Sequence, residues 1–384
     1  VTFLHLLPLL LSVAGAAFRR PIPATFNVLS YGASHNRFRD NTKAFLGAWN
    51  DACERKGGGR VYVPYGTYML YSVVFSGPCN GPVDFIIKGT LEATSNPSKF
   101  FTDHWIVFKY VDRLRVAGGG YLLGHGDAAW RYNDCAHNSW CRSLPIVSSF
   151  FFIGKLLLFV TKMLQYNWND LVKREYENAP ADSPNTDGIH IGSSTKINIR
   201  DSIISTGDDC VAIIAGSRDI SVTRVHCGPG HGFSIGSLGK SHNKEIVSGI
   251  VIQNSTLHRT QNGLRIKTWA PSLPSLASDI MFDDITMVDV NNPIFIDQQY
   301  CPRPPCNAKA QSNVQIKNVT FRKVRGTSSS KVAVKLQCSK HVPCEGVKLV
   351  NINLVYRGPE GRVESSCLNV QGKSYGLQLP SGCL

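Results

Sequence analysis

Asn185-Thr-Asp-Gly-Ile-His-Ile-Gly192 begins the stretch of sequence that decides the fold, and this stretch ends at Tyr300. Within it, short polar motifs lie among alternating apolar residues, and each motif adjoins an apolar run of strand type. The four motifs are Asn185-Thr-Asp-Gly188, Gly207-Asp-Asp-Cys210, Gly230-His-Gly232 and Arg265-Ile-Lys267.

The motifs recur at a regular spacing. Asp187, Asp209 and His231 follow one another at equal steps in the low twenties, and the later steps to Arg265 and Tyr300 are longer and nearly equal to each other. A period of this length built from short strands is typical of a β-solenoid with one coil per repeat. Because neighbouring strands lie roughly 4.8 Å apart, the repeat predicts that three carboxylates, an imidazole and an Arg-Lys pair form one cluster.

The four motifs in this order, together with Tyr300, resemble those of the polygalacturonases, the pectin-hydrolysing family of parallel β-helix glycoside hydrolases. The longer string Cys227-Gly-Pro-Gly-His-Gly-Phe-Ser-Ile-Gly-Ser-Leu-Gly239 is similar to the plant branch, and within it to the exo-acting, pollen-type enzymes. The resemblance covers residues 26–148 and 180–384. It implies an all-β fold, a right-handed parallel β-helix that forms a single catalytic domain over residues 18–384.

Composition and charge fit this interpretation. The chain has 384 residues, 43% of them hydrophobic, which is enough for one large core or two modest domains. Extended all-β folds often exceed the usual length of a single domain, so we interpret the chain as one domain. Its formal net charge of +14 predicts an anionic partner. No Lys/Arg run or nucleic-acid module is present, so we expect a polyuronate such as polygalacturonate or pectin, and neither nucleic acid nor a membrane. A basic solvated surface explains the charge alone equally well.

The N-terminal segment and the cysteines predict secretion to the extracellular space or cell wall. Residues 1–17 are apolar and end in small residues, as a secretory signal does; they begin with Val rather than Met, so we interpret the signal as truncated. Twelve cysteines favour disulfides in an oxidising compartment. Five pairs lie close in sequence: Cys135 with Cys141, Cys210 with Cys227, Cys301 with Cys306, Cys338 with Cys344, and Cys367 with Cys383.

The cysteines and two asparagines also bear on disulfide bonding, metal binding and glycosylation. Pairing of Cys210 with Cys227 would join adjacent coils beside the active-site strands. No Cys-x-x-Cys occurs, which argues against a zinc site. Asn254-Ser-Thr and Asn318-Val-Thr are glycosylation acceptors, or equally well unmodified strand or loop residues.

The two ends of the solenoid have distinct patterns. Residues 40–53 place apolar side chains at a helical period, which predicts a short N-terminal helix that caps the open end. Strands are predicted from Val61, over 83–87, over 106–108 and over 114–117. The cysteine-rich tail, Cys338 to Cys383, is expected to close the far end.

Residues 149–178 depart from the family pattern. Their apolar run carries Lys155, has no Gly/Asn turn punctuation and is short for a membrane span. A divergent insertion, a surface helix and a translated intron are the three explanations, of which we favour the last. A translated intron would put the coil immediately before Asp187, and with it a wall of the substrate groove, in doubt.

The resemblance also implies roles for the clustered residues. Glycosidic cleavage needs one carboxyl group to protonate the leaving oxygen and another to activate water. Asp208 is then the general acid, Asp187 and Asp209 hold and deprotonate the water, and His231 tunes the proton on Asp208. Substrate binding falls to Asn185, to Arg265 and Lys267 for the sugar carboxylate, and to Tyr300 for packing or hydrogen bonding. No cofactor or metal is expected, and we expect a monomer.

Each of these residues also has a structural interpretation. Asp187 could be a turn residue, and His231 could lie in a tight turn between its glycines. Asp208 and Asp209 could belong to a loop or bind calcium. Arg265 and Lys267 suit a solvated strand, and Tyr300 suits packing beside a disulfide. Their joint occurrence at coil spacing favours the catalytic interpretation.

Two other functions fit part of the sequence. A pectate lyase of the same solenoid class would need calcium and an arginine base, and the aspartate triplet with His231 fits hydrolysis better. A secreted, catalytically impaired wall-binding or allergen-type protein would keep the fold while residues 149–178 disrupt the site.

Overall fold

The computed structural model describes most of the chain: residues 23–94, 96–101, 104–111, 114–118, 120–125, 146–151, 183, 186–302, 306–307 and 309–384. The expected signal, residues 1–17, lies outside the described residues, as does most of the anomalous segment 149–178. Asn185, Cys135 and Cys141 also lie outside them.

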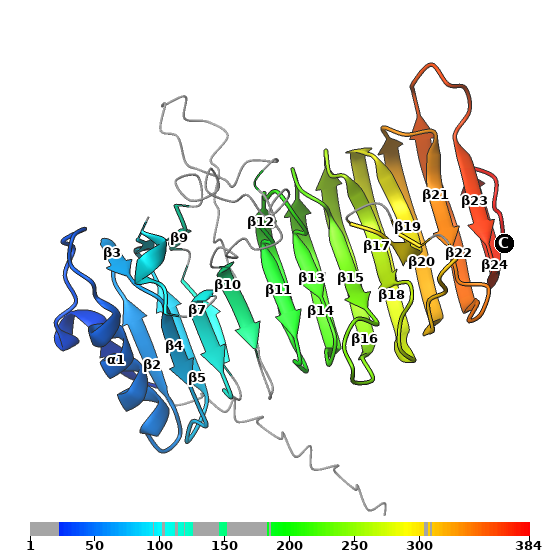
Figure 1. Ribbon diagram of the computed structural model, residues 1–384. Coiled ribbons are helices and arrows are strands. Elements are labelled where there is room, and N and C mark those ends of the chain that lie inside the picture. Colours follow the sequence, from blue (N-terminus) through cyan, green and yellow to red (C-terminus); the bar gives the residue numbers. More distant parts are fainter. Residues whose placement is uncertain are drawn as a thin grey trace, which may run out of the picture.

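The described strands stack into a solenoid in which adjacent coils contribute adjacent strands of the same sheets (Figure 1). Most neighbours in a sheet are strands that do not follow one another directly in the chain, and every pairing among the described strands is parallel. The predicted parallel β-helix is confirmed.

Two long sheets run along the solenoid: a ten-stranded sheet that begins in the N-terminal coils, and a seven-stranded sheet that is confined to the C-terminal coils. The ten-stranded sheet contains, in spatial order, β23 (Glu364–Leu368), β21 (Val332–Gln337), β19 (Asn292–Tyr300), β17 (Asn262–Trp269), β15 (Phe233–Leu238), β13 (Val211–Ile213), β11 (Ile189–Gly192), β10 (Ile146–Phe151), β7 (His104–Lys109) and β4 (Val73–Ser76). The seven-stranded sheet contains β12 (Asn198–Ile204), β14 (Arg218–Cys227), β16 (Ile246–His258), β18 (Ser275–Val290), β20 (Val314–Ser328), β22 (Cys344–Tyr356) and β24 (Val370–Leu379).

Two smaller sheets complete the N-terminal coils. The first contains β1 (Ala24–Asn27), β2 (Gly59–Val63), β5 (Val83–Ile87) and β8 (Leu114–Ala117), and the second contains β3 (Thr67–Leu70), β6 (Thr90–Ala93) and β9 (Tyr121–Leu123). The strands predicted over 83–87 and 114–117 have these bounds, and residues 106–108 lie within β7. Two 3₁₀ turns, η1 (Val28–Tyr31) and η2 (Pro97–Lys99), are the remaining short elements.

The core is a set of apolar columns that run along the solenoid. Alternation puts every second side chain of a strand inside, and the register places it on the equivalent residue of the next coil. One column on the ten-stranded sheet consists of Val211, Phe233, Leu264, Ile294 and Val334, each at most 2% exposed. Burying each such side chain stabilises the fold by about 1.5–3 kcal/mol.

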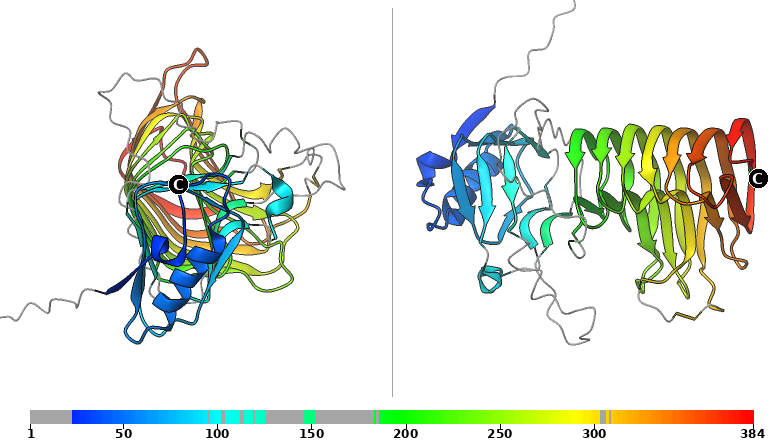
Figure 2. Two further views of the ribbon diagram at one scale, coloured as in Figure 1. Left: turned by 90° about the vertical axis from the view of Figure 1, so that its left-hand side faces the viewer. Right: turned by 90° about the horizontal axis from the view of Figure 1, so that it is seen from above.

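A single helix, α1 (Thr42–Glu54), covers the N-terminal end of the described solenoid, as predicted (Figure 2). Its apolar face carries Phe45 and Trp49, which are buried and pack on Phe85. The indole Nε1 of Trp49 donates to the carbonyl oxygen of Ser76 at 2.9 Å. A helix over the open end shields the edges of the first coil from pairing with another chain.

Five disulfides join described residues. Four are pairs that lie close in the sequence, Cys210–Cys227, Cys301–Cys306, Cys338–Cys344 and Cys367–Cys383. The fifth, Cys53–Cys79, ties the end of α1 to the loop after β4 and was not anticipated. The described part of the chain has no helix that is long and apolar enough to cross a membrane.

Candidate active site

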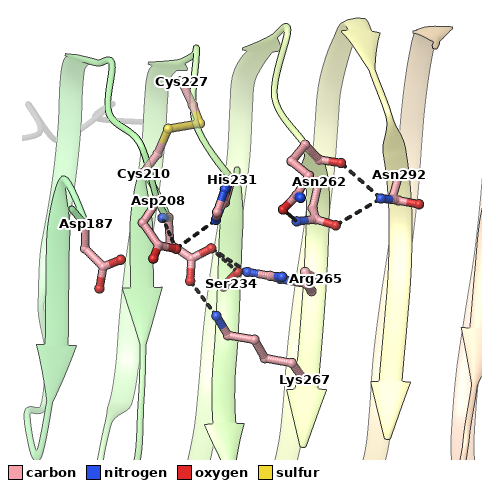
Figure 3. Close-up of polar contacts among 12 residues, drawn as sticks. Asp187, Asp208, Cys210, Cys227, His231, Ser234, Asn262, Arg265, Lys267 and Asn292 are labelled. Atoms are coloured by element: carbon pink, nitrogen blue, oxygen red, sulfur yellow. Dashed lines mark hydrogen bonds and ion pairs between the residues drawn. A yellow bond between two sulfur atoms is a disulfide. The ribbon is translucent and has the colours of Figure 1, made fainter. Parts of the chain in front are cut away.

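The first three polar motifs lie side by side at the N-terminal ends of adjacent strands of the ten-stranded sheet, and Arg265 and Lys267 lie within the next strand, β17. Asp187 precedes β11, Asp208 and Asp209 precede β13, and His231 precedes β15. Backbone bonds between coils fix this alignment: the amide of His231 donates to the carbonyl oxygen of Asp208 at 2.6 Å, and the amide of Asp208 donates to that of Thr186 at 3.1 Å. Figure 3 shows Asp187, Asp208 and His231 on one side of the sheet, with Arg265 and Lys267 beside them.

The glycines of the motifs let the coils approach closely. Gly232 has a φ of +86°, and a Cβ there would lie 2.0 Å from the carbonyl oxygen of Asn262 on the next coil. Only glycine combines this left-handed conformation with so small a gap. Gly230-His-Gly232 therefore sets the position from which the imidazole of His231 reaches Asp208.

Asp209 is the buried centre of the cluster, with 2% of its side chain exposed. Its Oδ1 accepts from Ser234 Oγ at 2.6 Å and from Arg265 Nη2 at 2.8 Å, and its Oδ2 accepts from Lys267 Nζ at 2.7 Å. Arg265 Nε also donates to Ser234 Oγ at 3.0 Å. Both cations, 8% and 9% exposed, thus hold Asp209, whereas the sequence predicts that they face the substrate carboxylate.

Asp208 and His231 form a second, more open pair. His231 Nδ1 lies 2.9 Å from Asp208 Oδ1, and about a fifth of the Asp208 side chain is exposed. Burial opposes ionisation of Asp208, but the hydrogen bond and charge of His231, with Lys267 and the Asp209 amide, outweigh it and lower the pKa of Asp208. The pair can hold one proton, either on the imidazole or on the carboxyl group.

Asp187 is the third carboxylate, and its environment differs from that of Asp208. Burial, with the charges of Asp209 and Asp208, raises the pKa of Asp187. His190 opposes this rise, because its Nδ1 lies 2.7 Å from Asp187 Oδ2. The environments of Asp187 and Asp208 thus move the pKa values of the two carboxyl groups in opposite directions.

Two aromatic side chains, Trp269 and Tyr300, lie next to Lys267. The Tyr300 ring packs edge-on against Trp269 at a centroid distance of 5.2 Å, and Lys267 Nζ lies 5.3 Å from the centroid of the Tyr300 ring. Burial raises the pKa of Tyr300, so its hydroxyl group remains a hydrogen-bond donor. Tyr300 thus joins the cluster through Lys267.

Sequence reasoning missed three residues that contact this cluster: His190, Ser234 and Trp269. Ser234 is paired in register with Arg265, and His190 lies three residues after Asp187. For Ser234 and His190, strand alternation was the available signal, because it places both side chains on the outer face of the sheet, where Arg265 also lies.

The cluster also has the ligand types of a metal site. One ligand atom from each of Asp208, Asp209 and His231 lies within 4.8 Å of the others. Asp209, however, already accepts from Arg265 and Lys267. A divalent cation would have to share that carboxylate with two positive charges, so the arrangement suits acid–base chemistry better than metal binding.

Comparisons with known proteins agree with this geometry. Residues 53–376 match glycosyl hydrolases family 28. The chain is 40% identical over 368 residues to the exopolygalacturonase of Platanus acerifolia, covering 93% of this chain and 97% of that protein. It is 38% identical over 377 residues to the polygalacturonase of Nicotiana tabacum, covering 96% and 94%.

The fold is shared with solved structures that are more distant in sequence. The endo-xylogalacturonan hydrolase from Aspergillus tubingensis has a TM-score of 0.69 at 22% identity, covering 93% of this chain and all of that chain. The polygalacturonase from Erwinia carotovora has a TM-score of 0.65 at 20% identity, covering 92% and 98%. On the extent of the family match and the identity to its plant relatives, the chain belongs to glycosyl hydrolases family 28.

Proposed function

We propose that the protein is a secreted polygalacturonase that hydrolyses α-1,4-galacturonosyl linkages of pectate and homogalacturonan in plant cell walls, with inversion at the anomeric carbon. The observation that carries the proposal is the Asp208–His231 pair, which is open to solvent beside two further carboxylates. The relatives at about 40% identity that are named polygalacturonases support the same substrate class.

In the proposed reaction, Asp208 delivers to the leaving oxygen the proton that it shares with His231. Asp187 and Asp209 hold the attacking water, and Asp187 accepts its proton because both oxygens of Asp209 already accept from Ser234, Arg265 or Lys267. The raised pKa of Asp187 makes its ionised form a stronger base than an ordinary aspartate. Arg265 and Lys267 share the single negative charge of Asp209, so one positive charge remains in excess and attracts the substrate carboxylate, while Tyr300 packs against a sugar.

We propose exo action of the pollen-type branch, on the strength of the string from Cys227 to Gly239. The relatives from Platanus acerifolia and Oenothera organensis are named exopolygalacturonases. Those from Nicotiana tabacum and Gossypium barbadense, at similar identity, are named only polygalacturonases. Endo action is therefore the second candidate.

Product analysis tests the proposal. The purified protein is incubated with polygalacturonate, and reducing ends and ultraviolet absorbance are followed. Release of saturated galacturonate monomer supports exo-hydrolysis, and mixed saturated oligomers support endo-hydrolysis. Products that absorb in the ultraviolet would mean a lyase, and no release by folded protein would mean a wall-binding protein.

A variant of Asp208 tests the assignment of the acid. We expect Asp208→Asn to lower kcat by about 10²–10⁴, the usual contribution of general acid catalysis. The thermal unfolding midpoint should stay near that of the wild type, since about a fifth of this side chain is exposed. Near-normal turnover by this variant would contradict the role given to Asp208.

A further inference from the structure

Arg265 belongs to a row of side chains that continues beyond the catalytic cluster. Register pairs Ser234 with Arg265, Arg265 with Phe295 and Phe295 with Lys335 across β15, β17, β19 and β21. The neighbours of Phe295 in the strand, Ile294 and Ile296, are fully buried, so Phe295 faces the same side as Arg265. At the strand spacing, Lys335 lies roughly 10 Å beyond Arg265 along the solenoid.

Lys335 is held in place by an aromatic ring rather than by an acid. Its Nζ lies 5.2 Å from the centroid of Phe295, and both side chains are partly exposed. Among the described residues, no ion pair within 4.0 Å includes Lys335; its charge acts on Asp297 from a greater distance. Arg265 and Lys267, by contrast, are both buried and bound to Asp209.

Because Lys335 has no acidic partner within 4.0 Å among the described residues, it differs in role from the buried cations beside Asp209. The cations nearest the acids neutralise a buried carboxylate of the protein itself. Lys335 is the member of the row that remains available to an anion from outside. A galacturonan carries one carboxylate per sugar, so a chain that lies over Asp208 and continues toward the C-terminal coils would bring a carboxylate over Lys335.

We propose that Phe295 and Lys335 form a binding subsite for a galacturonate unit outside the cleavage point. Lys335 pairs with the sugar carboxylate, and Phe295 is a positioning residue that holds the ammonium group of Lys335 over the sheet. The proposal rests on the proposed function, because it takes the polymer to be a polyuronate bound along the solenoid.

Substrate length tests the subsite. Lys335→Gln is compared with the wild type on galacturonate oligomers from the dimer upward. We expect KM to rise about tenfold for the longer oligomers, the effect of losing one charge-assisted hydrogen bond, with kcat unchanged. The dimer should show no change, because it leaves the subsite empty when it spans the cleavage point. Phe295→Leu should give a smaller rise in the same direction, and Lys335→Arg should retain most of the affinity.

Lys348→Gln is the matched control, because Lys348 is an exposed lysine of β22 in the other long sheet. Equal KM values for Lys335→Gln and Lys348→Gln, or an equal rise on dimer and hexamer, would overturn the subsite while leaving the hydrolase intact. If the wild type cleaves no galacturonan, the proposed function fails instead. Calorimetric binding of hexagalacturonate to wild type and Lys335→Gln then tests the subsite, and equal affinities would overturn it.

Discussion

Asp209 shows how burial changes the role of a charged residue. Removing two cations and a carboxylate from water is costly, and the contacts from Ser234, Arg265 and Lys267 offset that cost only when all are present. Asp209 and its three partners therefore act as one unit, so a substitution that disturbs the site should also lower the stability of the fold.

Lys267→Met tests this coupling. The variant leaves Asp209 with one cation, so we expect the free energy of unfolding to fall by roughly 3–5 kcal/mol, together with a loss of activity. Chemical denaturation measures the first and reducing-sugar release the second. The control Lys348→Met, which removes an exposed lysine, should change neither. Unchanged stability of Lys267→Met would mean that the pair with Asp209 contributes little.

His190 gives a prediction about pH. Its hydrogen bond favours the ionised form of Asp187, so His190→Ala should raise the pKa of Asp187 further. Because the proposed base must be ionised, activity should then begin to fall at a higher pH as the solution is acidified. The pH profile of kcat/KM measures this shift.

Two controls accompany that profile. His190→Gln keeps a neutral donor and should shift the acidic limb less, and His258→Ala, at an exposed residue ending β16, should not shift it. An acidic limb that is identical in His190→Ala and the wild type would show that Asp187 does not control it.

At the scale of the element, the disulfide Cys210–Cys227 encloses most of one coil. It links the residue before β13 to the last residue of β14, and both cysteines are buried. Since Cys210 follows Asp209 directly, the bond also fixes the turn that carries two of the three carboxylates.

Removing this bond should cost more than removing a shorter one. We expect Cys210→Ser/Cys227→Ser to lose about 3 kcal/mol of stability, because its loop spans 17 residues, and Cys301→Ser/Cys306→Ser, with a separation of five, to lose about 2 kcal/mol. Guanidinium unfolding of both double variants gives the comparison. A larger loss in the second would contradict an explanation based on loop size.

Sequence reasoning located the elements better than the contacts between them. Helical periodicity predicted α1, and alternation with glycine turns predicted β5 and β8, because these patterns are local. The Cys53–Cys79 bond spans 26 residues and follows from how α1 packs on the first coils. The bonds of Asp209 to Arg265 and Lys267 could not be predicted either, since coil spacing sets which residues are neighbours but not which of them share a proton or an ion pair.

At the scale of the whole molecule, the formal charge of +14 acts on any polyanion. We expect the KM for polygalacturonate to rise severalfold as NaCl is raised from low to high concentration, with kcat unchanged, because salt screens exposed charges. Highly methyl-esterified pectin is the control and should respond less. An equal response of the two substrates would remove the electrostatic explanation.

The coils differ in length while their sheets remain in register. Phe233 pairs with Val211 on one neighbouring strand and with Leu264 on the other, although the second step along the chain is longer than the first. Ile294 pairs with Val334, and the number of residues between these two positions in the chain is larger still. Most extra residues are therefore accommodated in the connections between sheets, and the few register shifts within the ten-stranded sheet leave this buried column aligned. In such a solenoid, one connecting loop can change in length or sequence without moving the others. The loops that surround the substrate can therefore differ while the catalytic side chains on the strands stay in place.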